Sequence, residues 1–394
     1  MAGDEREGGI VPHRTHDVLV VGGGIIGVSI AYYLSKRGID VGVVEKGYLG
    51  SGCSGATMGL VGASSRTPVS YALLAERSKE LFAELAVNLG REIHYERCGM
   101  IRVFRTPAML EKGETIIQLN RTAGIDVSYI DRAGVSDLEP HLSTDKILGA
   151  AFCPTDGRVD PFAVLRGLVA QIRNQGSSLY FNTRVLRVEP GRRTVRLVTS
   201  SGVFEAAKVV IAAGIWSPLI CQSMGIGLPL RPVRGQVLIT QRLPRLFTHV
   251  ISPAISQYWR GNIILGFSSE EVGYDNRNTF STLQSIAADI ILKSPELRKV
   301  RIIRSFSGLR PMPFDGYPLL DQLPGHRNIF VTSTHSGIAL SQAIGDYMAQ
   351  WIAEDKKDRM LDDYSLRRPS LVEPPRPYRA AGAEGYLIGR RGRS

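Results

Sequence analysis

Three glycines near the N-terminus have the spacing of a turn that binds phosphate groups. Gly22, Gly24 and Gly27 follow a short β-branched run at 17–21 and open a stretch with helical apolar spacing at 25–37. In such a turn the first glycine permits a tight bend, the second lets a pyrophosphate approach the backbone at the helix N-terminus, and the third lets helix and strand pack closely. The spacing predicts a dinucleotide site.

Two further segments extend this prediction. Glu45 follows an apolar strand at 41–44, where a carboxylate can accept hydrogen bonds from a ribose diol. Residues 50–59 form a loop of mostly small residues, which allows close backbone approach to a ligand that extends beyond its first phosphate. Taken alone, that loop is also typical of a flexible surface segment. These residues leave NAD and FAD as alternatives.

The elements that must position these residues begin with a βαβ unit over 17–44. The apolar period predicts amphipathic helices at 73–89 and 162–174. Because strands and helices do not alternate steadily through the middle of the chain, we expect a mixed α/β fold in which a partly antiparallel sheet domain is inserted into the dinucleotide-binding domain. Further strands are predicted at 99–104, 179–188, 208–211, 237–240, 263–267 and 329–332.

The composition narrows the class of protein. With 394 residues, 43% of them hydrophobic, the chain has room for two domains with real cores. Residues 367–394 hold seven arginines and two glutamates, so this tail carries +5 of the formal net charge of +11. The rest of the chain has no dense Lys/Arg run, which argues against nucleic-acid binding and is compatible with small anionic ligands.

The cysteines and the hydropathy argue for a reducing compartment. Cys53, Cys98, Cys153 and Cys221 lie far apart and form no Cys-x-x-Cys pair, so we predict neither a metal site nor an iron–sulfur cluster within the chain. The N-terminus is polar and acidic, and no uninterrupted run of about 20 apolar residues occurs. We therefore expect a cytoplasmic protein with no membrane span.

Several motifs occur in an order that resembles the D-amino-acid oxidase superfamily of flavoproteins. After the glycine turn, its acid and the small-residue loop come Val209–Ser217, Pro232–Gln236, Gly308–Pro311 with Asp315-Gly316, and His335–Ile338. The resemblance covers residues 16 to about 355. It is closest to the branch of glycine and sarcosine oxidases and of the FAD-bearing β subunits of heteromeric amine dehydrogenases, such as octopine oxidase, D-hydroxyproline dehydrogenase, dye-linked proline dehydrogenase and hydrogen cyanide synthase.

This resemblance implies a Rossmann-like FAD-binding domain with an inserted antiparallel-sheet substrate domain. The FAD-binding domain is expected over 15–90, 145–225 and 325–365, and the substrate-binding domain over 91–144 and 226–324. Residues 1–14 and 366–394 are expected to be flexible or partner-docking termini.

The cofactor implied is noncovalent FAD, because flavin-linked relatives use a late cysteine and the last cysteine here is Cys221. The residues implied in FAD binding are Gly22, Gly24, Ile25, Ile26, Gly27, Glu45, Lys46, Ser51, Ser54, Gly55, Ala56, Met58, Gly59, Val185, Ala213, Gly214, Trp216, Arg310, Ser336, Gly337, Ile338 and Ala339.

Four residues are candidates for the substrate site. Arg310 takes the position where amino-acid oxidases of the family hold the substrate carboxylate, and a guanidinium fork suits two carboxylate oxygens; the alternative is a surface salt bridge. His335 precedes the turn and helix N-terminus that the family places beside the flavin ring, and it is either catalytic or a structural hydrogen bonder. Tyr258 and Trp259 either line the substrate cavity or are ordinary strand aromatics.

The resemblance implies oxidation of the C–N bond of a small amino or imino acid by hydride transfer to flavin N5. Arg310 would anchor the carboxylate, and no side-chain base is required. We expect the β subunit of a heteromeric dehydrogenase, in which any additional FMN or iron–sulfur centre lies at or in partner subunits. The alternatives are a stand-alone glycine- or sarcosine-type oxidase that uses O2 and a 2-hydroxy-acid dehydrogenase on the same fold.

Overall fold

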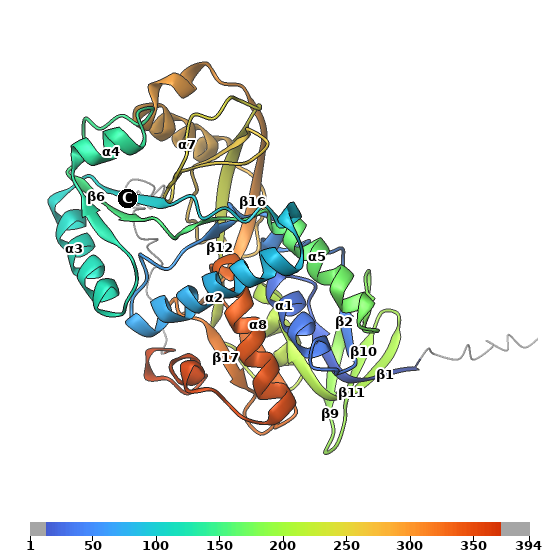
Figure 1. Ribbon diagram of the computed structural model, residues 1–394. Coiled ribbons are helices and arrows are strands. Elements are labelled where there is room, and N and C mark those ends of the chain that lie inside the picture. The colour runs from blue at the N-terminus through green and yellow to red at the C-terminus, as the bar shows by residue number, and fades with distance from the viewer. Residues whose placement is uncertain (1–12, 372–394) are drawn as a thin grey trace, which may run out of the picture.

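The computed structural model describes residues 13–371 as two lobes (Figure 1). Each lobe is built on an eight-stranded sheet, and a short ribbon pairs β3 (Leu60–Val61) with β7 (Gly157–Arg158). Over the described range, the helices are too short or too polar to cross a lipid bilayer.

The first sheet is parallel at its centre. In its strand β1 (His13–Val21), Val18 and Val20 face one apolar core, whereas Leu19 and Val21 face another. Burial on both faces explains why the last four residues of this strand, 18–21, are continuously apolar. The strand order is β17 (Leu319–Gln322), β18 (Ile329–Ser333), β11 (Gly202–Ile211), β1 (His13–Val21), β2 (Val41–Val44) and β8 (Ser178–Tyr180), and all pairs from β18 to β8 are parallel.

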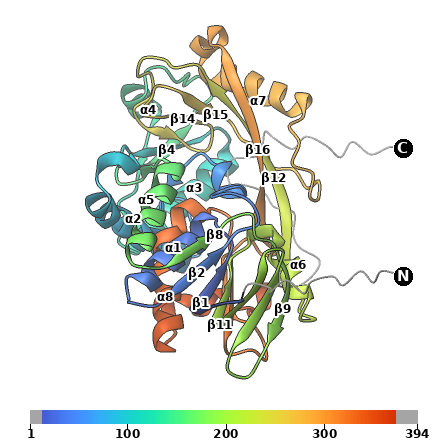
Figure 2. The same cartoon turned by 90° about the vertical axis from the view of Figure 1, so that its right-hand side faces the viewer.

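Helices cover one face of this sheet (Figure 2), namely α1 (Ile25–Ser35), α2 (Val69–Asn88), α5 (Pro161–Asn174) and α8 (Gly337–Glu354). The other core is enclosed by β9 (Val185–Pro190), β10 (Val195–Thr199) and α6 (Ser217–Gln222). Because α1 follows β1 and α8 follows β18, two helix N-termini meet at the carboxyl edge of the sheet, where α/β proteins bind ligands.

The second sheet is antiparallel except where β13 pairs with β4. Its order is β16 (Ile302–Pro313), β12 (Leu230–Thr240), β15 (Ile263–Leu265), β14 (Ile255–Gln257), β13 (Val250–Ile251), β4 (Met100–Phe104), β6 (Gly149–Cys153) and β5 (Ser128–Ile130). The helices of this lobe are α3 (Pro107–Thr122), α4 (Arg132–Leu138) and α7 (Phe280–Lys293). The long strands β12 and β16 pair along their length and carry the Gly308–Pro311 motif.

The expected mixed α/β fold with an inserted sheet domain is confirmed, with three local differences. The predicted strand at 179–188 is divided into β8 and β9, because Asn182 between them has a left-handed backbone with φ of 52°. Strand β6 belongs to the substrate-side sheet although it lies beyond residue 144, and β17 belongs to the first sheet although it precedes residue 325. Hydrogen bonding to β4 and β18 respectively places these two strands.

The segment 366–371 is packed onto the first lobe and is not a flexible terminus. Arg368 donates to both carboxylate oxygens of Asp315, at 2.6 and 2.9 Å, and Ser370 donates to the same carboxylate at 2.6 Å. This paired contact holds the segment against the turn after β16. Residues 13 and 14 of the predicted N-terminal segment 1–14 are instead the first residues of β1, paired with β11. The rest of the predicted terminal segments, 1–12 and 372–394, lies outside the described residues.

Candidate functional site

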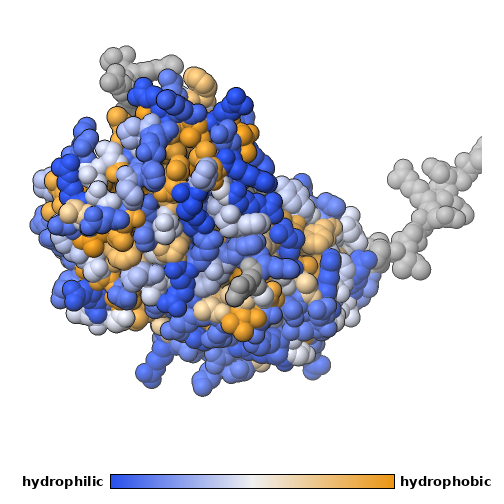
Figure 3. Space-filling view, turned by 45° about the horizontal axis from the view of Figure 1, so that its top comes forward, coloured by the Kyte–Doolittle hydropathy of each residue, from blue (hydrophilic) through white to orange (hydrophobic). Residues whose placement is uncertain are grey.

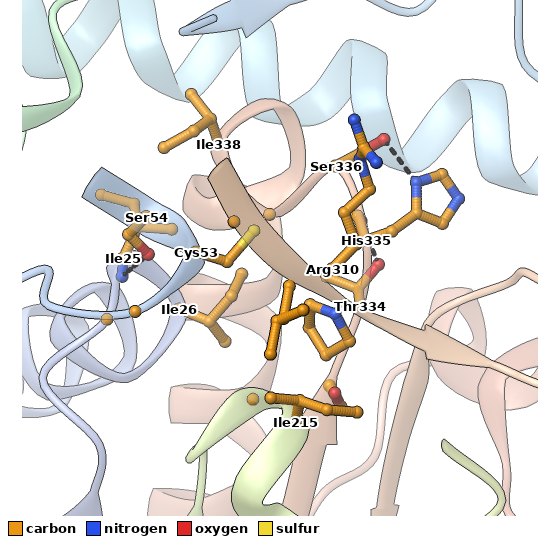
Figure 4. A pocket seen from close by; sticks show the side chains of 18 of the residues that line it. Ile25, Ile26, Cys53, Ser54, Ile215, Arg310, Thr334, His335, Ser336 and Ile338 are labelled. Carbon is orange, nitrogen blue, oxygen red and sulfur yellow. Dashed lines mark hydrogen bonds between the residues drawn. The ribbon is translucent and has the colours of Figure 1, made fainter. Parts of the chain in front are cut away.

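A cavity of about 1560 Å³ is lined by residues of both lobes. Every residue of the predicted FAD set lines it except Gly27, Gly55 and Gly59. Figure 4 shows side chains from α1, from the small-residue loop, from β16 and from the start of α8 converging on this space. Its volume exceeds the roughly 300–1,000 Å³ of ordinary small-molecule pockets, so it suits an extended ligand together with a substrate.

The glycine turn is built as its spacing predicts. Gly22 has a φ of 121°, and a Cβ there would lie 2.5 Å from the Ala212 carbonyl oxygen. A Cβ on Gly27 would lie 2.2 Å from the Gly22 carbonyl oxygen, so Gly27 supports helix–strand packing from behind the cavity wall. At Gly24 the nearest atom to a Cβ is the Ser54 hydroxyl at 3.3 Å, and Gly24 itself lines the cavity.

Glu45 fixes the turn from the neighbouring strand. Its carboxylate accepts hydrogen bonds from the backbone N–H of Gly23 at 2.7 Å and of Gly47 at 2.8 Å, and from the Ser51 hydroxyl at 3.1 Å. Carboxylate oxygens have more than one lone pair, so these bonds leave capacity for a ribose hydroxyl.

The polar groups at the carboxyl edge of the first sheet fit FAD. The first residues of α1 and α8 line the cavity, so the positive dipole ends of both helices lie at its wall. Neither N-cap residue, Gly24 or Ser336, caps its helix with its own side chain, and at α1 the Ile25 N–H donates to the Ser54 hydroxyl at 2.9 Å. The hydroxyls of Thr332 and Ser333 are buried in the cavity wall without a hydrogen-bond partner among residues 13–371. Buried hydroxyls are normally bonded, so a polar ligand such as FAD would complete this wall.

Lys46, Trp216 and Val185 of the predicted cofactor set also line the cavity. Lys46 places its Nζ 3.2 Å from the centroid of the Trp216 ring, and Val185 lies nearby in the lining. Gly55 and Gly59 stand behind the lining, where a Cβ would collide with the Gly50 carbonyl oxygen and the Tyr258 hydroxyl respectively. They therefore allow close packing of the loop, and the cofactor contacts predicted for them stay a prediction.

Replacing Gly24 with valine is expected to remove bound FAD without unfolding the chain, because the new side chain would occupy the cavity at the helix N-terminus. The ratio of visible to ultraviolet absorbance of the purified protein measures FAD content, and circular dichroism measures folding. Gly227→Ala is the matched control, since a Cβ at Gly227 meets no atom within 4 Å. Normal FAD content in Gly24→Val would contradict the placement of the pyrophosphate.

Arg310 lies in the cavity wall on β16. Its Nη1 donates to the Ser268 carbonyl oxygen at 3.0 Å, and its Cζ lies 5.4 Å from the centroid of the Phe267 ring. The facing strand makes room for it, since a Cβ on Gly235 would lie 2.2 Å from Nη2. The guanidinium is thus held on protein atoms at one side while it lines the cavity, which suits a carboxylate ligand.

His335 also lines the cavity, between an aromatic ring and a hydroxyl. Its Nε2 lies 3.5 Å from the Tyr71 hydroxyl, and its Nδ1 lies 2.9 Å from the Ser336 hydroxyl. Burial, together with the charges of Arg66 and Arg310, lowers the pKa of His335 to about 3. The imidazole is therefore neutral at physiological pH, which favours hydrogen bonding over proton uptake.

Tyr258 and Trp259 are placed outside the cavity lining. The Tyr258 hydroxyl donates to the Met58 carbonyl oxygen at 2.7 Å, and the ring packs in an apolar cluster with Ile264. Trp259 stacks on His94 with 3.8 Å between ring centroids. Both residues lie between β14 and β15, and the hydroxyl of Tyr258 ties this turn to the small-residue loop. The substrate contacts predicted for them stay a prediction.

The sequence motifs missed one side of the cavity. Arg66, Tyr71, Arg102 and Tyr317 line it together with Arg310 and His335. Arg66 places its Cζ 4.7 Å from the centroid of the Tyr71 ring, and Tyr71 meets Tyr317 edge-on at 5.9 Å. Nothing in their spacing marks these residues, because they come from separate loops, strands and helices.

A buried ion pair supports the loop that carries Arg66. Lys79 Nζ lies 3.0 Å from Asp156 Oδ1, and the two side chains are 3% and 1% exposed. Asp156 also accepts hydrogen bonds from the Ala63 backbone N–H and from the Ser64 hydroxyl, at 3.0 and 2.6 Å. These contacts fix residues 62–66 against α2. No group of three or more His, Cys, Asp or Glu side chains that could hold a metal ion is found over the described range.

Comparison with known proteins identifies the family to which this site belongs. The model of the FAD-dependent oxidoreductase family DAO matches residues 17–351. The chain is 30% identical to glycine oxidase of Geobacillus kaustophilus, and the alignment covers 90% of this chain and 97% of that protein. The crystal structure of glycine oxidase from Geobacillus kaustophilus superposes with a TM-score of 0.85 and 28% identity, and the superposition covers 90% of this chain and 99% of the other. Hydrogen cyanide synthase subunit HcnC of Pseudomonas aeruginosa is 28% identical, with 84% of this chain and 93% of that protein covered. Because the family model spans the glycine turn, the cavity residues Arg310 and His335 and most of the folded chain, the chain belongs to the DAO family of FAD-dependent oxidoreductases.

Proposed function

We propose that the chain uses FAD to oxidise the C–N bond of a small amino or imino acid. The observation that carries this proposal is the position of Arg310, whose guanidinium lines the same cavity as the glycine turn and the N-terminus of α8. An arginine so placed pairs with a carboxylate by two parallel hydrogen bonds. The similarity to glycine oxidase supports an amino acid as substrate.

The residues of the cavity have separable tasks in this reaction. Arg310 binds the carboxylate and so orients the α carbon, which lowers the entropic part of the barrier. Gly337 and Ile338, at the N-terminus of α8, present backbone amides and a positive dipole to negative charge. Bound FAD supplies a two-electron acceptor for the hydride that leaves the α carbon. Ile26 and Ile215 keep this part of the cavity apolar (Figure 4).

The charges around the substrate favour a neutral amine, which is the form that can lose hydride. Arg66 and Arg310 both act on His335, so both act on the space beside it. Nearby positive charge lowers the pKa of a bound ammonium group, so the ammonium releases its proton to solvent on binding. Loss of hydride from the α carbon of the neutral amine then leaves an iminium ion, which water hydrolyses. His335, being neutral, is placed to position the substrate by hydrogen bonding. Its role as a catalytic residue stays a prediction.

The proposal also covers the protein partner and the electron acceptor of the reaction. We infer a heteromeric dehydrogenase, because HcnC is a subunit of a larger enzyme and because α7 and the start of β16 expose apolar side chains. Phe280, Leu292 and Ile303 are 82%, 70% and 61% exposed. Figure 3 looks toward the end of the molecule that carries α7 and shows apolar patches there among charged side chains.

Four cysteines without a disulfide support a cytoplasmic location.

The test is the visible spectrum of the purified chain under anaerobic conditions as glycine, sarcosine, L-proline or L-2-hydroxyglutarate is added, followed by air. Bleaching of the FAD band by an amine is expected. Slow recovery in air would support a dehydrogenase that hands electrons to partner subunits, whereas rapid recovery would support the oxygen-using oxidase. Bleaching by the hydroxy acid alone would overturn the amine assignment.

A further inference from the structure

The cavity wall carries more arginine side chains than the binding of one carboxylate requires. Arg66, Arg102 and Arg310 all line it, and they come from three separate elements: the loop after β3, strand β4 and strand β16. We call these three side chains the arginine triad. Three elements of the fold thus bring guanidinium groups to one enclosed space.

The triad is organised around the Tyr71–His335 contact. Arg66 lies over the Tyr71 ring, with its Cζ 4.7 Å from the centroid, and the Tyr71 hydroxyl lies 3.5 Å from His335 Nε2. Arg102 Nη2 donates to the Ser65 hydroxyl at 2.9 Å, so it stands beside the same loop. Arg66 and Arg310 both act electrostatically on His335. A small ligand beside His335 is therefore within the field of two guanidinium groups from different walls.

Within residues 13–371, the acidic side chains that line the cavity are Glu45 and Asp315, and both are engaged away from Arg66 and Arg310. Glu45 lies at the glycine turn and accepts hydrogen bonds from Gly23 and Gly47. Asp315 is paired through both oxygens with Arg368, and that pairing holds the pKa of the carboxyl below its ordinary value. His335 contributes no charge because its imidazole is neutral.

We propose that the substrate carries a second carboxylate, which Arg66 binds with support from Arg102, while Arg310 binds the carboxylate on the reacting carbon. This inference rests on the proposed function and names its substrate class. A monocarboxylate would offset only one of the charges that converge on His335. A dicarboxylate would pair with both Arg66 and Arg310. Hydrogen bonds between two charged groups are stronger than those between neutral groups.

The second carboxylate can stand on the nitrogen substituent or on the side chain, and matched ligand pairs separate the two cases. Sarcosine and iminodiacetate differ only by a carboxylate on the nitrogen substituent. Alanine and aspartate, each as both enantiomers, differ only by a carboxylate on the side chain. Methylthioacetate and thiodiacetate have sulfur in place of the amine, so they measure binding to the FAD-loaded protein through its visible difference spectrum without turnover.

The wild-type protein is expected to bind thiodiacetate about 10- to 150-fold more tightly than methylthioacetate, as one added hydrogen-bonded charge pair implies. Arg66→Leu should lose this preference and keep its affinity for methylthioacetate, and Arg66→Lys should keep part of it. Arg121→Leu, at an exposed position on α3, is the control. Because Arg66 also donates to the Gly62 carbonyl oxygen, Arg102→Gln provides a second variant that leaves that bond in place.

Equal affinities for the two sulfur ligands in the wild-type protein would exclude a second carboxylate on the nitrogen substituent, and equal kcat/KM for alanine and aspartate would exclude one on the side chain. Both results together, or an unchanged preference in both Arg66→Leu and Arg102→Gln, would overturn the inference. The proposed function would still stand in that case if sarcosine or alanine bleached the FAD. Conversely, absence of bleaching by every amine would reject the proposed function, and the thiodiacetate preference would still report on the triad.

Discussion

Replacing Arg310 with leucine is expected to lower kcat/KM for the amine substrate about 30- to 5,000-fold, with FAD content unchanged. The reason is that the substrate carboxylate loses a desolvated charge partner, a loss of about 2–5 kcal/mol, while the glycine turn and Glu45 are untouched. Since Arg310 orients the α carbon as well as binding the carboxylate, kcat should fall together with the rise in KM.

The neighbouring residues provide controls for this variant. Arg304→Leu removes an exposed arginine from the same strand and should leave the kinetics unchanged. Gly235→Val leaves Arg310 in the sequence but fills the space of its guanidinium, where a Cβ would lie 2.2 Å from Nη2, so it should reproduce much of the loss. Near-normal kinetics in Arg310→Leu would show that the carboxylate is held elsewhere.

Replacing Asp156 with leucine is expected to destabilise the chain by about 3–5 kcal/mol, because the buried Lys79 would lose its buried carboxylate partner and keep only Glu76, whose side chain is 29% exposed. The loop that carries Arg66 would also lose its hydrogen bonds to Asp156. Urea unfolding followed by circular dichroism measures the change. Lys79→Met combined with Asp156→Leu should recover most of this loss, since an apolar pair leaves no buried charge and the remaining carboxylate, Glu76, is partly exposed to water. Equal destabilisation in the single and double variants would contradict this account.

The pH dependence of stability should separate wild type from Asp156→Leu. Lys79 and hydrogen bonds lower the pKa of Asp156, so its contribution is complete above the unfolded pKa of about 3.9 and is lost as pH falls through the lower folded value. The pKa of Lys79 is raised, so its contribution is complete below the unfolded value of about 10.4 and is lost above it. Between these two pH limits, the difference in the free energy of unfolding between wild type and Asp156→Leu should be constant.

The parts of the site that depend on local spacing could be predicted from the sequence. Gly22 and Gly24 stand where their spacing requires, because a strand, a tight turn and a helix are consecutive in the chain. Arg310 could be assigned only through a family motif, since its neighbour Gly235 is far away in the sequence and meets it through the pairing of β12 with β16.

Contacts between distant segments could not be predicted in this way. Arg66 reaches the cavity because Asp156 and Lys79 hold its loop, and these residues are unremarkable in composition and spacing. Tyr258 was a plausible cavity residue by type, but its hydroxyl is engaged by Met58 across the interface between the lobes. In both cases, contacts with residues far away in the sequence decide whether the side chain points into the cavity.

The ion pair between Asp315 and Arg368 makes the segment after α8 part of the cavity. It holds residues 366–371 against the turn after β16, and Pro369 and Ser370 of this segment line the cavity. A fragment cut at residue 365 would therefore lose two lining residues and would leave the Asp315 carboxylate without the guanidinium that pairs with it. Removing a segment far in sequence from the glycine turn would thus change the shape and the charge of the same cavity.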